Sequence, residues 1–293
     1  MADYVIITDS CVDLPYETIR ELDVDYIPLS VKVEEEVYLN YLDEREISFS
    51  EFYQKLNDKK KTKTTQANPE DFIRLMRPYL EQGKDILSIS LSSALSGTYN
   101  SSRLAREDLL EIFPERKIIL IDSLAASMGQ GLLVTYAAKM RKEGKSIEEV
   151  AEWAENNKQR IAHLFTVDDL NFLRRGGRLS LIPALLGTIL RVKPLLHVSK
   201  EGRLTVEGKA RGRSHAIERI FERMLETIEK PEEQIIYISH GDCLDDALLL
   251  KEKIEKALPV KEIKINYIGP VIGNHSGPGT LALFYMGNDR MEE

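Results

Sequence analysis

The chain contains very little cysteine. Among 293 residues there are two, Cys11 and Cys243, which lie far apart and lack the spacing of metal ligands. Two cysteines are too few for a disulfide framework and fit a reducing compartment. His275 also has no second histidine, cysteine or carboxylate at ligand spacing. The sequence therefore predicts neither a metal site nor a bound cofactor.

Positive charge is in deficit, and long hydrophobic runs are absent. The net charge of -8 argues against a nucleic-acid partner, and the one dense basic run, 59–63, is expected to be a solvated loop. Residues 1–4 lack the basic-then-apolar order of a signal peptide. The most apolar stretch, 181–198, is interrupted by prolines and basic residues, so it does not predict a membrane span. We expect a cytoplasmic protein.

What the sequence does contain is the composition of a folded protein, with 43% hydrophobic and 30% charged residues. Up to about residue 160, short β-branched runs alternate with helical patterns. Strands are predicted over 4–7, 26–33, 85–90 and 117–121. Helices are predicted over 48–56, 69–80, 127–142 and 146–157, and another helix follows the hydroxyl-rich turn after the strand 85–90 and reaches residue 110. This alternation is typical of an α/β fold with a parallel or mixed sheet flanked by helices.

After residue 160 the pattern changes. A strand at 163–167 precedes a glycine-rich basic loop, Arg174 to Arg178, and Ser199 to Gly202 is a clear hairpin turn. Alternating helices and strands then continue to Met286. We therefore predict two α/β domains, 1–160 with a mostly parallel sheet and 161–293 with a mixed sheet and helices.

The most informative polar segment is Ser92 to Ser102, where a buried strand gives way to a helix. Ligands of α/β proteins usually bind at this end of a strand, and a helix start offers unpaired N–H groups and partial positive charge. An anion such as a carboxylate or phosphate is the ligand that this chemistry favours. Plain N-capping by serine explains the segment equally simply and, on local grounds alone, is the favoured interpretation.

Three further polar positions have local interpretations of their own. Thr64 to Pro69 is a second polar loop that opens a helix, with Asn68 as the cap. His275 lies between glycines, so we expect an irregular backbone there and a ring that faces a cleft. Asp13 is predicted to cap a helix that reaches about Leu22.

Signals of catalysis are weak. Ser96 lies in Leu-Ser-Gly and not in the Gly-x-Ser-x-Gly turn of α/β hydrolases, and Asp9 has no aspartate two positions later. The glycines within Arg175 to Arg178 do not form a phosphate-binding loop. We therefore do not predict an enzyme. A stand-alone lipid or phosphate hydrolase or transferase that uses Ser96, Asp9 or His275 remains an alternative, as does a regulatory module whose lipid is a signal.

Taken together and in order, the motifs resemble the DegV family of bacterial fatty-acid-binding proteins. The matching blocks span nearly the whole chain: Ile7 to Ser10 with Asp13-Leu14, Thr64 to Gln66, Leu95 to Tyr99, Ile121 to Ser123, Leu173 to Ser180, Lys193-Pro194, Ala210-Arg211 and His275 to Gly279. Each block is common by itself, but the ordered set is specific. The chain departs from the family pattern at Thr65, where serine is more usual, and at Ala67, where proline is common.

The resemblance implies a two-domain α/β fold with one long-chain, palmitate-like fatty acid in a tunnel between or within the domains. Carried over by position, Thr64, Ser96 and His275 hold the carboxylate, and Arg211, Gly97 and Thr98 are candidate supporting residues. It also implies a carrier that presents the acid to a separate fatty acid kinase, which makes the acyl-phosphate. The apolar segment Leu181 to Leu190 is expected to line the tunnel, to act as a lid that contacts a membrane transiently, or to be an ordinary core helix.

Overall fold

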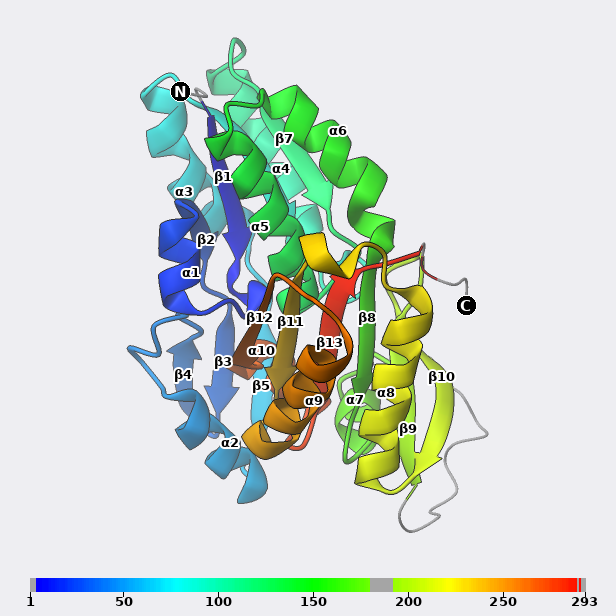
Figure 1. Cartoon of the computed structure of the whole chain (residues 1–293). Helices are drawn as coiled ribbons and strands as arrows, with labels where there is room; N and C mark the ends of the chain where they lie inside the picture. The colour runs from blue at the N-terminus through cyan, green and yellow to red at the C-terminus, as the bar shows by residue number, and fades with distance from the viewer. Residues whose placement is uncertain (1–3, 180–191, 289, 291–293) are drawn as a thin grey trace.

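The computed structural model describes residues 4–179, 192–288 and 290, and three sheets lie within that part of the chain (Figure 1). The arrangement of these sheets decides where the polar motifs of the sequence come together. The candidate lid, Leu181 to Leu190, falls outside the described residues. No helix of the described part has the length and apolar character needed to span a bilayer.

The first sheet is fully parallel and occupies the upper part of Figure 1. Its strand order is β2 (Val24–Ile27), β1 (Tyr4–Asp9), β6 (Asp85–Ser90) and β7 (Ile118–Asp122). The sheet is covered on both faces, because β1 sends Ile6 into one core cluster and Ile7 into another. Helices α5 (Met128–Lys142) and α6 (Ile147–Asn157) pack on the Ile6 face, and α3 (Pro69–Glu81) and α4 (Thr98–Ile112) on the Ile7 face.

The second sheet is mixed and has six strands. Their order is β10 (Leu204–Arg211), β9 (Val192–Val198), β8 (Ile161–Thr166), β13 (Leu281–Met286), β11 (Ile235–His240) and β12 (Glu262–Tyr267). Only the pairing of β11 with β12 is parallel. Helices α8 (Arg213–Thr227) and α9 (Leu244–Ala257) cover one face, and α5 packs on the other. Helix α5 therefore lies between the two large sheets.

A third, small sheet has the antiparallel order β4 (Glu36–Leu39), β3 (Ser30–Val33) and β5 (Thr62–Thr65), with α2 (Phe49–Asn57) packed against it. Two short helices of the second half, α7 (Asn171–Arg175) and α10 (Pro270–Ser276), lie next to each other, and α10 also contacts β3, β5 and α2. Helix α1 (Tyr16–Glu21) follows β1 after a 3-10 turn. The small sheet thus joins the N-terminal half to α10.

The predicted α/β class, with a parallel sheet first and a mixed sheet second, is confirmed. Every strand of the parallel sheet precedes residue 160 and every strand of the mixed sheet follows it, and the domain boundary at residue 160 stays a prediction. The helix cap predicted at Asn68 is present, and Asn68 forms a full capping box with Asp71. The hairpin at Ser199 to Gly202 is also confirmed.

Two predicted elements in the first half are wrong. Residues 26–33 are not one strand, because the chain leaves β2 at Ile27 and enters β3 of another sheet at Ser30. Pro28, which has no N–H to give to a ladder, lies at the break. Thr64 and Thr65 lie in strand β5 and not in a loop, since their backbones pair with Val31 and Ser30.

Three local predictions about turns are also wrong. Asp13 does not cap α1, because it is fully buried in a left-handed conformation and Pro15 holds the cap position. Arg174 and Arg175 are helical, as the end of α7. His275 has a regular helical backbone in α10, which begins at Pro270, a favoured residue for a first helical turn.

Candidate functional site

An apolar cavity of about 330 Å³ lies at the junction of the three sheets. Its walls come from β5, from the turns after β6 and before α5, from α7 and α10, and from β8, β9, β10 and β13 of the mixed sheet. Typical aliphatic and aromatic lining residues are Leu29, Leu91, Phe165, Val198, Val271 and Phe284. A mostly apolar cavity with a few polar groups is the usual form of a small-molecule site.

The polar end of the cavity brings together residues that are distant in sequence. Thr64 of β5 and His275 of α10 both line it, and Thr64 Oγ1 lies 2.8 Å from His275 Nε2. Burial, together with the nearby Arg178 guanidinium, lowers the pKa of His275 to about 4. The imidazole is therefore neutral near pH 7. Gly176 leaves room for the ring, since a Cβ there would lie 2.2 Å from Nδ1 of His275.

Ser96 lines the same cavity from the turn that precedes α4. Its Oγ lies 2.9 Å from Thr98 Oγ1 and accepts a hydrogen bond of 3.2 Å from the Thr98 N–H. Ser96 therefore satisfies the first N–H of α4, although Gly97 holds the N-cap position and no side chain caps this helix, while the Ser96 side chain stays at the cavity wall. Bonding to the helix start and lining the cavity are compatible for this serine.

Gln66 connects the end of β5 to the turn before α4, a contact that the sequence did not predict. Its Oε1 accepts a 3.1 Å hydrogen bond from the Gly97 N–H, and its amide nitrogen lies 3.5 Å from Ser101 Oγ. A Cβ at position 97 would lie 2.3 Å from Gln66 Oε1, so glycine permits this approach. The signal in the sequence that could have indicated this contact is the presence of Gln66 in the family-matching block Thr64 to Gln66. Gln66 holds the Thr64 strand and the Ser96 turn at a fixed separation.

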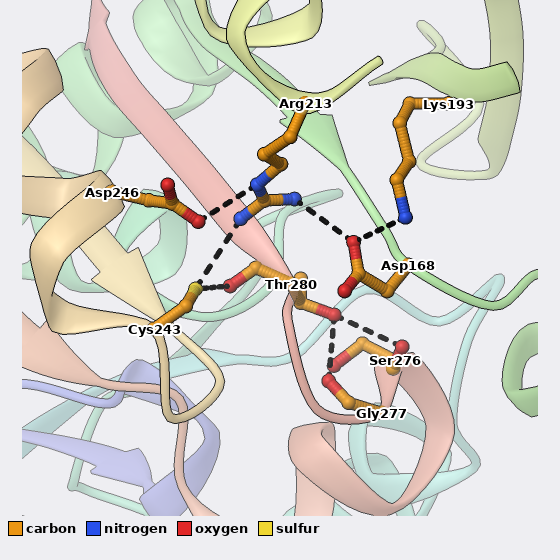
Figure 2. Close-up of polar contacts among 8 residues, drawn as sticks. All are labelled: Asp168, Lys193, Arg213, Cys243, Asp246, Ser276, Gly277 and Thr280. Carbon is orange, nitrogen blue, oxygen red and sulfur yellow. Dashed lines mark hydrogen bonds and ion pairs between the residues drawn. The ribbon is translucent and has the colours of Figure 1, made fainter. Parts of the chain in front are cut away.

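The polar end opens into a second, wider cleft of about 1110 Å³, and Lys63, Thr64, Arg178 and His275 line both spaces. The walls of the cleft carry many charged side chains. In Figure 2, Arg213 points between Asp246 and Asp168, with N–O distances of 2.8 and 3.5 Å. The Thr64–His275 pair therefore lies where an apolar space meets a charged one.

The candidate supporting residues differ in their placement. Gly97 and Thr98 are at the site through their contacts with Gln66 and Ser96. Arg211 is exposed on β10 and is absent from the described lining of both spaces, so its supporting role remains a prediction. Two cationic residues, Lys63 and Arg178, line the polar end; both were predicted to lie in loops, but Lys63 is in strand β5.

The residues of the alternative hydrolase hypothesis do not form a nucleophile and base within the described part of the chain. Ser96 bonds to Thr98, while His275 bonds to Thr64. Asp9 is fully buried and accepts hydrogen bonds from the N–H groups of Leu91 and Cys11, at 2.9 and 3.0 Å. This bonding ties β1 to the turn after β6, which is a structural role.

Aromatic rings lie at the other end of the cavity. Thr280 immediately precedes β13 and Phe284 lies four residues further on, about 13 Å along the extended chain; both residues line the cavity. The Phe284 ring meets the His163 ring edge to face, with centroids 5.2 Å apart. Burial lowers the pKa of His163, whose Nδ1 lies 2.9 Å from the Ile161 carbonyl oxygen. The His163 imidazole is therefore neutral near pH 7.

Comparison with known proteins gives a consistent answer. The sequence model of a family described as "uncharacterised protein, DegV family" matches residues 3–288. A DegV domain-containing protein of Clostridium perfringens is 45% identical over 290 residues, which cover 99% of each chain.

Two solved structures are similar over nearly their whole length. A fatty-acid-binding DegV family protein of Thermus thermophilus has a TM-score of 0.89 and 34% identity, with 98% of this chain and 100% of that chain covered. A stearic acid-binding protein of Eubacterium ventriosum has a TM-score of 0.87 and 26% identity, with 97% and 98% covered. The chain belongs to the DegV family.

Proposed function

We propose that this protein is a carrier of one long-chain fatty acid. The observation that supports it is a mostly apolar cavity whose polar end carries Thr64, Ser96 and His275. The related proteins of Thermus thermophilus and Eubacterium ventriosum, described as binding fatty acid and stearic acid, have the same fold. The hydrocarbon tail occupies the apolar walls, and the carboxylate lies among the hydroxyl groups.

The tail supplies most of the affinity. About fifteen methylenes at roughly 0.8 kcal/mol each contribute on the order of 12 kcal/mol of burial. Ordering a flexible chain and immobilising the ligand offset a large part of this. The head-group contacts, at about 0.5–1.5 kcal/mol per hydrogen bond, then decide orientation more than strength.

The head group is presented to a separate fatty acid kinase, which forms the acyl-phosphate. Its neutral hydroxyl partners donate hydrogen bonds without a full ion pair, so a carboxylate oxygen keeps its capacity to attack a phosphoryl group. The position of Thr64 and His275 at the opening to the charged cleft supports this role, because a partner enzyme would approach from that side.

Native mass spectrometry of the purified protein tests the ligand, and the expected result is a co-purified long-chain acid. Affinity for an acid and for the alcohol of the same length then tests the head group. Thr64→Val and Ser96→Ala should each weaken acid binding about tenfold, the equivalent of one hydrogen bond, with a smaller effect on the alcohol. Thr62→Val, two residues earlier on β5 and outside the cavity lining, is the matched control.

A reconstituted kinase assay tests presentation. Thr64→Val and Ser96→Ala should also lower the rate of acyl-phosphate formation at saturating acid. Unchanged turnover and unchanged acid affinity in both variants would rule out a carboxylate held by these hydroxyls.

A further inference from the structure

A buried carboxyl group lies outside the cavity, at the joint between the two halves of the chain. Asp13 has no exposed surface. Its Oδ2 accepts a 2.6 Å hydrogen bond from Ser127 Oγ, and its Oδ1 accepts a 3.0 Å hydrogen bond from the Gly269 N–H. These two partners lie 114 and 256 positions away along the chain. One side chain therefore connects the turn after β1, the start of α5 and the start of α10.

The backbone at this joint is strained. Asp13 has φ 48° and ψ 24°, a left-handed conformation that aspartate tolerates but does not prefer. Ser127, its hydrogen-bond partner, has φ 53° and ψ -146°, a conformation normally reserved for glycine. Strained residues persist only where their surroundings fix them, and they cluster at functional sites. Here two such residues are bonded to each other.

The joint is connected to the head-group site through α10. Gly269 is the N-cap of α10, and His275 lies in the last turn of the same helix. The approach at Gly269 is close, since a Cβ there would lie 2.7 Å from Asp13 Oδ1. On the other side, Ser127 lines the cavity itself and lies 3.1 Å from Ser239 Oγ. A shift of Asp13 would therefore move both a cavity wall and the helix that carries His275.

The groups around the carboxyl add a further constraint. Asn266 donates a 2.9 Å hydrogen bond to the Asp13 carbonyl oxygen, and Tyr53 bonds to Ile268 O next to the joint. Burial, with the charge of Asp9 as a smaller cause, raises the pKa of Asp13 to about 8. An asparagine has the same shape as the aspartate, its amide oxygen can accept the Gly269 N–H, and its amide group can bond to the Ser127 hydroxyl.

We propose that Asp13 is a positioning residue for the bound acid: it fixes the start of α10 against α5 and thereby sets His275 against Thr64. The inference depends on the proposed function, because it names a residue that acts on the head group without contacting it. It also gives a role to the Asp-x-x-x-Asp-Leu motif, whose second aspartate has no cavity contact.

The test measures the ratio of the affinities for a long-chain fatty acid and for the alcohol of the same length. A merely structural residue would change both affinities alike. Asp13→Ala should lower the ratio about tenfold, the effect expected for losing one head-group hydrogen bond, and Asp13→Asn should restore it to within about twofold. Thr135→Val is the matched control, because Thr135 makes another buried contact between the halves, 2.9 Å to the Tyr237 hydroxyl, without touching α10.

Gly269→Ala perturbs the same contact from the other side and keeps the test valid where Asp13→Ala does not fold. It should lower the ratio as well. Wild-type ratios in Asp13→Ala and Gly269→Ala would overturn the inference, as would an equal fall in Thr135→Val. A wild-type chain that binds neither lipid would instead overturn the proposed function on which the inference depends.

Discussion

The most direct test of the head-group geometry is a single methyl group at Gly176. This glycine ends α7 with φ -72°, so alanine is compatible with its backbone. The added Cβ would lie 2.2 Å from Nδ1 of His275, however, and 3.2 Å from two ring carbons. The imidazole would have to move by about 1 Å to reach ordinary contact, and the 2.8 Å contact between Thr64 and His275 would break.

The expected magnitude can be worked from these contacts. Forcing a methyl against a buried ring costs about 1–3 kcal/mol of stability. Losing a neutral hydrogen bond at the head group costs about 0.5–1.5 kcal/mol of binding, or roughly a 2- to 12-fold rise in the Kd for the acid. The Kd for the alcohol of the same length should change less, because the tail contacts remain.

Gly177 provides a control in the same loop. It has φ 68°, so alanine there is strained by about 1 kcal/mol, yet within the described part of the chain a Cβ at that position meets no atom within 4 Å. Gly177→Ala should lower the melting temperature and leave the acid Kd unchanged. Calorimetric titration with the acid and the alcohol, plus thermal unfolding, measures both effects. Wild-type acid affinity in Gly176→Ala would refute the assigned position of His275.

Three further outcomes are expected. Asp13 has a pKa of about 8 in the folded protein against 3.8 for the free group, so between these pH values the native state keeps a proton that the unfolded state releases. The free energy of unfolding should therefore fall by up to about 1.4 kcal/mol per pH unit as the pH rises through this range. Urea unfolding of Asp13→Asn should show no such fall from this site. Gln66→Ala removes the acceptor of the Gly97 N–H and should weaken acid binding about threefold in the same titration. Phe284→Leu opens space beside His163 and should shift the co-purified acid toward longer chains, as read by mass spectrometry.

The local sequence was sufficient to predict those helices and turns whose determining contacts lie within a few residues. Capping residues at Ser48, Asn68 and Ser146 bond within their own first turns, so the prediction needed no distant partner. The hairpin at Ser199 to Gly202 has the same property. The motif order also pointed to Thr64, Ser96 and His275 as one set, although only through resemblance to a family.

The secondary-structure predictions were wrong where a segment pairs or packs with residues that are distant in the sequence. Residues 26–33 have the uniform pattern of a single strand, yet β2 pairs with β1 and β3 pairs with β5 of another sheet. Pro28 lies at the break between them but does not determine which strands they pair with. An irregular backbone was predicted at His275, whereas α10, which packs against the small sheet, makes that segment helical. In both places tertiary contacts override the local pattern.

The sequence by itself determined which residue types are available: apolar residues for a core, hydroxyl groups in two polar segments, and a histidine near the C-terminal end. Only the tertiary structure decided that Thr64 contacts His275 across 211 positions, that Gln66 holds Gly97, and that Asp13 joins α5 to α10. The physical reason is that side-chain periodicity reports contacts within a few residues. A cavity between sheets depends on long-range packing, which no local window contains.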